Sequence, residues 1–191
     1  MENTQEKRKF NTYDIVLVGV MSAVVFAANF LSIPIGDVTR IHFGNVFCVL
    51  SGILLGAVRG GLCAGLGGFF YDLTNPLYAA EAPLTFIMKF VIGFFAGLIA
   101  NRGGRQGKKM GSNILGACVG SVSYIVLYLV KNFIEQYFLI KNPMPTVMAL
   151  LATKAGASLL NAVLAVVVAV LLAPAFHTVL ERSGIWRKIT K

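Results

Sequence analysis

Charged and amide side chains recur inside apolar stretches of this sequence, at spacings that could bind a small polar molecule. Lys89, Lys131 and Lys154 each stand within a hydrophobic segment, and Asn132 and Glu135 lie within about one turn of Lys131. A charge at lipid depth costs about 3 kcal/mol on insertion scales, so such groups are expected to face a bundle interior or a water-filled cavity. The pattern predicts a ligand pocket. For Lys131 and Glu135, at i and i+4, an internal ion pair near the membrane surface is the alternative.

The elements that must position these groups are apolar helices. Six apolar stretches are separated by turn sequences such as Asn75-Pro76 and Asn142-Pro143. The sixth stretch is expected to stop at Pro174 and to be followed by an interfacial segment that contains Trp186. We therefore expect a single all-α integral membrane domain over 1–191, a bundle of six transmembrane helices at about 13–35, 43–58, 60–73, 83–100, 112–140 and 145–173, with the interfacial segment at 175–188.

Composition supports this class and excludes a water-soluble domain. Hydrophobic residues make up 57% of the 191 residues and charged residues only 13%, whereas a soluble domain carries about a quarter charged residues. The net charge of +9 would indicate a nucleic-acid partner in a soluble protein. Here the basic residues cluster at helix ends, which is typical of membrane topology determinants.

The distribution of Lys and Arg predicts the orientation. Twelve of them fall at the termini and in the connections on one side, and two fall on the other side. The positive-inside bias then places the N and C termini in the cytoplasm. A cleaved signal peptide over 7–26 is the alternative, but its removal would leave five crossings.

In this orientation every deep ionisable residue falls in the outer half of the bilayer. We therefore expect a pocket that opens outward and is closed on the cytoplasmic side. The lysines and Arg40 slightly outnumber the acidic residues, which suits a ligand with a carboxylate or phosphate. The residues predicted to bind the substrate are Arg40, His42, Asn45, Asp72, Asn75, Tyr78, Glu81, Lys89, Tyr128, Lys131, Asn132, Glu135, Lys154, Ser158 and Asn161.

Signatures of catalysis are missing from the sequence. It contains no phosphate loop of the G-x-x-x-x-G-K-[ST] type, no HExxH and no GxSxG. His42 and His177 are expected at opposite faces of the membrane, and Cys48, Cys63 and Cys118 have no metal-ligand spacing. We expect no catalytic residue, no metal site, no cofactor and no enzymatic activity.

Small residues recur every four positions in several helices, which is how helices pack closely in lipid. Most of these stripes are expected inside the bundle. The stripe of Gly19, Ala23 and Ala27 in the first helix is the best candidate for a docking face toward another membrane protein, because a terminal helix is the easiest to expose.

Several stretches resemble one transporter family. The segments at 40–45 (Arg-Ile-His-Phe-Gly-Asn), 51–56, 60–68 and 82–89, together with the Ala23/Ala27 stripe, are similar to the substrate-binding S components of energy-coupling-factor (ECF) vitamin transporters. The resemblance implies capture of a water-soluble vitamin or precursor at the plasma membrane of a prokaryote. It also implies docking, through the Ala23/Ala27 stripe, onto a transmembrane coupling subunit with two ATPase subunits, which use ATP in place of this chain.

The resemblance leaves the vitamin open among pantothenate, pyridoxine-type compounds and pyrimidine precursors. The competing hypothesis from the residues themselves is a self-contained ion-coupled carrier that uses Asp72, Glu135 and Lys154 as its relay.

Overall fold

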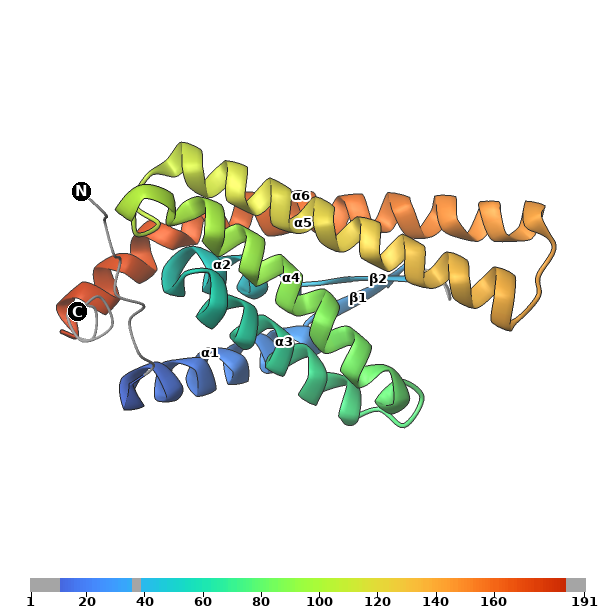
Figure 1. Ribbon diagram of the computed structural model, residues 1–191, viewed down its shortest axis with the longest axis horizontal. Coiled ribbons are helices and arrows are strands. Elements are labelled where there is room, and N and C mark those ends of the chain that lie inside the picture. The colour runs from blue at the N-terminus through green and yellow to red at the C-terminus, as the bar shows by residue number, and fades with distance from the viewer. Residues whose placement is uncertain (1–10, 36–38, 185–191) are drawn as a thin grey trace, which may run out of the picture.

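The described part of the chain folds into six α-helices and one short β-hairpin (Figure 1). The computed structural model describes residues 11–35 and 39–184, with side chains described outside 34–40. The α-helices are α1 Thr12–Phe30, α2 Gly44–Leu55, α3 Ala57–Leu73, α4 Ala82–Ala100, α5 Met110–Ile134 and α6 Met144–Arg182. Three short pieces join them, the 3-10 turns η1 Ala79–Glu81 and η2 Arg102–Gly104 and the π-helical turn η3 Glu135–Leu139. The prediction of an all-helical fold is confirmed.

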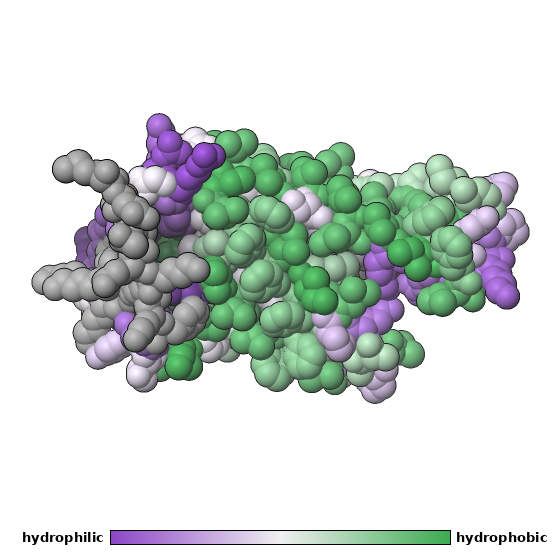
Figure 2. Space-filling view, in the orientation of Figure 1, coloured by the Kyte–Doolittle hydropathy of each residue, from purple (hydrophilic) through white to green (hydrophobic). Residues whose placement is uncertain are grey.

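Four of the described helical stretches are long and apolar enough to cross a membrane, namely Thr12–Phe30, Ala79–Ala100, Met110–Leu139 and Met144–Arg182. With 12 residues, α2 would extend only about 18 Å, and the glycine-rich α3 has 17 residues. On the face shown in Figure 2, apolar side chains form a broad band across the middle of the molecule, while hydrophilic ones gather toward both ends and in a recess near the end where α5 and α6 project. The number of full crossings stays a prediction.

The first helix is shorter than predicted. It begins at an Asn11 capping box, in which the Asn11 side chain accepts from the Asp14 backbone and the Asp14 carboxylate accepts from the Asn11 backbone. It ends at Phe30, and Ser32–Ile35 forms β1, which pairs antiparallel with β2 at Thr39–His42. The predicted extension to residue 35 is wrong because Pro34 has no backbone N–H for a helix.

The second and third helices form a tight hairpin. Gly56, with a φ of 84°, separates them, three residues earlier than the predicted break at 59. Gly52 and Gly60 then lie backbone to backbone, because a Cβ at Gly60 would overlap the main chain of Gly52. Gly93 of α4 contacts Gly60 in the same way, so internal packing accounts for these small-residue stripes.

The last helix is longer than predicted. It does not stop at Pro174 but continues to Arg182, and the part of the segment beyond 184 lies outside the described residues. A proline removes only one main-chain hydrogen bond, and contacts with the α4–α5 connection hold the helix beyond it. Lys108 pairs with Glu181 at 2.6 Å, and Gly107 lies against the ring of His177.

The end of α5 also differs from the prediction. The helix predicted to end at 140 changes at Glu135 from α-helix to a π-helical turn. Together with the start of α6, this end of α5 projects beyond the ends of α3 and α4 (Figure 1). The other end of the molecule holds the start of α1, the α4–α5 connection and the end of α6 (Figure 1).

Candidate functional site

A cavity of about 510 Å³ lies among the helices, the hairpin and the α3–α4 connection. Thirteen of the fifteen residues predicted from the sequence line it, from five helices, β2, the α3–α4 connection and the turns η1 and η3. These thirteen are His42, Asn45, Asp72, Tyr78, Glu81, Lys89, Tyr128, Lys131, Asn132, Glu135, Lys154, Ser158 and Asn161. That they bind a ligand stays a prediction.

Two predicted residues are not among those that line the cavity. The side chain of Asn75 faces its own turn, where its Oδ1 accepts a hydrogen bond of 3.0 Å from the backbone of Leu77. This is the ordinary role of Asn in a turn, and substrate binding by Asn75 stays a prediction. The side chain of Arg40 lies outside the described residues.

The sequence prediction missed other polar and aromatic residues of the cavity. Asn29 at the end of α1 is one, and a search for amides as well as charges within apolar segments would have found it. Tyr124 is another, four residues before Tyr128 on the same face of α5. The remaining lining residues that were not predicted are Ser32, Gly68, Tyr71, Thr85 and Met88.

Lys89 joins three helices at one wall of the cavity. Its Nζ donates to Oδ1 of Asn29 at 3.0 Å and to Oδ1 of Asn45 at 2.9 Å, and only 4% of the residue is exposed. Asn29 is oriented by its own hydrogen bond to the carbonyl of Val25. Gly68 makes room for the lysine, because a Cβ there would lie 2.8 Å from Lys89 Cγ. The ammonium is thus fixed by amides from α1 and α2.

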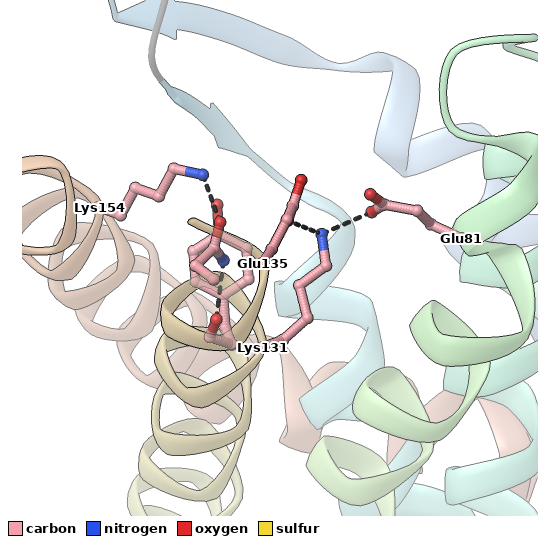
Figure 3. Close-up of polar contacts among 6 residues, drawn as sticks. Glu81, Lys131, Glu135 and Lys154 are labelled. Carbon is pink, nitrogen blue, oxygen red and sulfur yellow. Dashed lines mark hydrogen bonds and ion pairs between the residues drawn. The ribbon is translucent and has the colours of Figure 1, made fainter. Parts of the chain in front are cut away.

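Lys131 forms a charged cluster with two glutamates (Figure 3). Its Nζ lies 2.8 Å from a carboxylate oxygen of Glu81 and 2.8 Å from one of Glu135. The pair with Glu135 is the i, i+4 alternative considered from the sequence. The pair with Glu81 connects α5 to the start of α4 across 50 positions of sequence, which local spacing cannot predict.

Lys154 reaches the cavity from α6. Its Nζ donates to Oδ1 of Asn132, and the Asn132 amide nitrogen donates to the Tyr128 carbonyl at 2.7 Å. The same ammonium lies 5.9 Å from the centre of the Tyr128 ring, which stacks on Tyr124 with centroids 5.8 Å apart. The arrangement presents a cation beside two aromatic faces.

The β-hairpin is attached to α6 beside the cavity. The backbone N–H of His42 donates to Oδ1 of Asn161 at 3.0 Å. Ser158, one turn away on α6, lines the same space. The hairpin is thus the non-helical wall of an otherwise helical site.

Within 11–35 and 39–184, no group of three His, Cys, Asp or Glu side chains is arranged to hold a metal ion. The cavity instead offers ammonium groups, carboxylates, amides and aromatic rings, a set suited to hold a polar molecule.

The predicted docking stripe is on the surface of α1. Gly19, Ala23 and Ala27 are exposed, and no atom lies within 4 Å of where a Cβ of Gly19 would be. Its role as a docking face stays a prediction.

An all-helical chain with membrane-length apolar helices around a polar cavity is a membrane-embedded protein for small polar molecules. Residues 9–178 match the family model described as "ECF-type riboflavin transporter, S component". The chain belongs to this family, so it is a membrane-embedded substrate-binding component of a vitamin transporter and not an enzyme.

One solved structure shows the fold independently. It is described as "Structure and mechanism of the S component of a bacterial ECF transporter" and superposes with a TM-score of 0.59 at 18% identity. The match covers 87% of this chain and 96% of that one. No curated protein sequence matches the chain. The resemblance to ECF S components predicted from the sequence is confirmed.

Proposed function

We propose that this chain is the high-affinity subunit that captures a water-soluble vitamin or precursor outside a prokaryotic cell and passes it inward across the plasma membrane. The observation that carries the proposal is a cavity lined by charged, amide and aromatic side chains within an apolar helix bundle. Polar groups at such depth are costly unless they serve a ligand or each other. Family membership favours this reading over a self-contained ion-coupled carrier.

The proposed orientation puts the cavity on the outer side and both termini in the cytoplasm. The start of α1, the α4–α5 connection and the end of α6 all lie at the same end of the molecule, which supports this orientation (Figure 1). The described part of that end carries Arg59, Arg102, Arg105, Lys108 and Lys109, as the positive-inside bias requires of a cytoplasmic surface.

The proposed partners are a transmembrane coupling subunit and two ATPase subunits, which would hydrolyse ATP on behalf of this chain. The exposed Gly19, Ala23 and Ala27 support docking through α1, because small residues let a partner helix approach closely. Ala23→Trp should therefore leave ligand binding unchanged and abolish uptake in cells that contain the complete transporter. Leu171→Trp, on the exposed surface of α6, is the control for added bulk away from this stripe. Equal uptake by the Ala23 variant and the wild type would contradict docking at this stripe.

The vitamin itself is open among several candidates. Riboflavin is a candidate because the family description names it. The sequence resemblance adds pantothenate, pyridoxine-type compounds and pyrimidine precursors as candidates. A cavity of about 510 Å³ lies within the range of roughly 300–1,000 Å³ that holds small ligands. The stacked rings of Tyr124 and Tyr128 would suit a flat or partly apolar portion of the molecule.

The binding proposal is tested by thermal unfolding of the purified chain against a panel of B-group vitamins and their precursors. A tight ligand stabilises the folded state in proportion to ln(1 + [L]/Kd), and no nucleotide should be needed. Proteoliposomes with this chain alone should bind the same compound but not accumulate it under a proton or sodium gradient. Gradient-driven accumulation would support the carrier instead.

A further inference from the structure

The charges of the cavity are paired unevenly. Six charged side chains line it, three basic and three acidic, namely Lys89, Lys131, Lys154, Asp72, Glu81 and Glu135. Lys131 takes both glutamates as ion-pair partners, at 2.8 Å each. Of the groups that remain, two are lysines and one is an aspartate.

Both remaining lysines are held by amides instead of carboxylates. Lys89 donates to Asn29 and Asn45, and Lys154 donates to Asn132. Within the described side chains, neither ammonium lies within 4.0 Å of a carboxylate oxygen, the limit for an ion pair. Amide oxygens orient an ammonium and replace part of its hydration, but they do not neutralise its charge.

Asp72 can compensate one of these charges at most. It lines the cavity from the end of α3, without an ion pair among the described residues, and Lys89 is the unpaired lysine whose charge it opposes. Even with Asp72 counted against Lys89, Lys154 has no carboxylate within ion-pair distance among the described side chains, and Glu135, which pairs with Lys131, acts on it only from farther away. An ammonium has three N–H donors, and Lys154 uses one of them on Asn132, so two are left for a ligand.

From this distribution we infer that the molecule bound in the cavity is an anion, a small organic carboxylate or phosphate ester, whose acidic group is held by Lys154 with Lys89 as the second positive charge. The inference rests on the proposed function. It adds the charge of the substrate, and it favours an acid over the neutral riboflavin of the family description. A bound carboxylate or phosphate would supply the direct counter-charge that Lys154 lacks and would add to that of Asp72 at Lys89.

The same distribution orients the ligand. Figure 3 shows Lys154 approaching from α6 and Glu81 from the opposite side, with Lys131 and Glu135 between them. The Glu81–Lys131–Glu135 cluster carries one more negative than positive charge. The ligand's hydroxyl or amine groups would therefore face this cluster while its acidic group faces Lys154.

The first test needs no variant. In the vitamin panel, the compound that stabilises the purified wild-type chain most should be an anion at pH 7. Two matched pairs then isolate the charge, pantothenate against its alcohol, and riboflavin 5′-phosphate against riboflavin. The first pair probes a carboxylate and the second a phosphate. In at least one pair the anion should bind at least about 30-fold more tightly than its neutral counterpart.

The second test assigns the charge to Lys154. Lys154→Gln should weaken the preferred anion about 30-fold and leave its neutral counterpart unchanged, while Lys154→Arg should keep the preference. Lys108→Gln, which removes an equal charge from the surface outside the cavity, should change neither. Unfolding temperatures without ligand show that each variant is folded.

The outcomes separate this inference from the proposed function. A neutral or cationic vitamin as the tightest ligand overturns the inference and leaves vitamin capture standing. Equal weakening of both members of a pair by Lys154→Gln overturns it too. If no member of the panel binds, the proposed function and the inference fall together.

Discussion

The same helices pack closely in one half of the bundle and stand apart around the cavity in the other half. One half holds the cavity. The other, called here the closed half, comprises residues 92–100 of α4, 112–121 of α5 and 162–173 of α6, where Ala96, Ala117 and Ala169 have no exposed surface. Gly116 and Gly120 of α5 lie against main-chain carbonyls of α4, at Ala96 and Ile92. Small residues bring the helices together there, and large polar ones keep them apart in the cavity half.

From this difference we expect that the chain alone does not conduct its ligand across the membrane. The buried polar side chains of the closed half are Ser112, Asn113 and Ser121 of α5. Close helix contact leaves little space for water there, so we expect a ligand to enter the cavity half but not to pass through the closed half without a rearrangement. Release on the other side must then depend on a movement of this chain or of its partners.

The largest effect is expected from filling a contact of the closed half. A Cβ at Gly97 would overlap the backbone of Gly56 and Ala57, so Gly97→Leu must force α4 away from the α2–α3 turn. We expect a loss of about 3 kcal/mol or more of unfolding free energy, measured by denaturation in detergent. Gly156→Leu is the matched control, because no atom lies within 4 Å of its added Cβ. Equal losses in both variants would show that helix approach is not what holds the closed half together.

The second effect concerns a buried ion pair at the same end of the molecule. Asp14 is fully buried, and Nε of Arg59 lies 3.2 Å from its carboxylate. Arg59→Met should cost about 3 kcal/mol of unfolding free energy, because it removes a cation that compensates a buried charge. The double variant Arg59→Met/Asp14→Asn should recover part of this loss. No recovery would mean that Arg59 acts through packing alone.

The third effect belongs to the cavity half and should change binding more than stability. Asn132→Leu removes the amide that holds Lys154 in place, and we expect about 30-fold weaker ligand binding, equivalent to about 2 kcal/mol. Binding is measured by ligand-dependent thermal stabilisation. Ser123→Ala, which removes a hydroxyl of α5 outside the cavity, is the control. Unchanged affinity in the Asn132 variant would separate this amide from the ligand site.

The sequence predicted the two halves unequally well. Periodic small residues and charges within apolar segments were enough to predict the helices and most of the cavity residues, because lipid leaves few other places for them. The end of α1 and the extent of α6 were mispredicted because a proline can either lie outside a helix or be accommodated within one. Pro34 stands in a strand, and Pro174 stays within a helix whose later turns are fixed by contacts such as Lys108 with Glu181.

Partnerships between distant segments lay beyond the sequence. The bonds from Lys89 to Asn29 and Asn45 join α4 to α1 and α2, and the pair of Lys131 with Glu81 spans 50 positions. Only the three-dimensional packing brings these groups together. That packing decides which lysines are neutralised and which remain available to a ligand, the property from which the charge of the ligand is inferred.

The smallest effect is expected where the cavity cluster meets solvent. The Lys131 side chain is 18% exposed and that of Glu81 is 39% exposed, so their attraction is partly screened. A double-mutant cycle of Lys131→Met and Glu81→Gln should give a coupling energy of about 0.5 kcal/mol in unfolding free energy, and this should fall as salt is added. The Asp14–Arg59 cycle, measured alongside, should be several times larger and little affected by salt. If both cycles respond to salt alike, the two ends are equally hydrated and the closed half is not dry. A salt-dependent cycle at Lys131 alone would place water at the cavity end only, where a ligand must exchange with it.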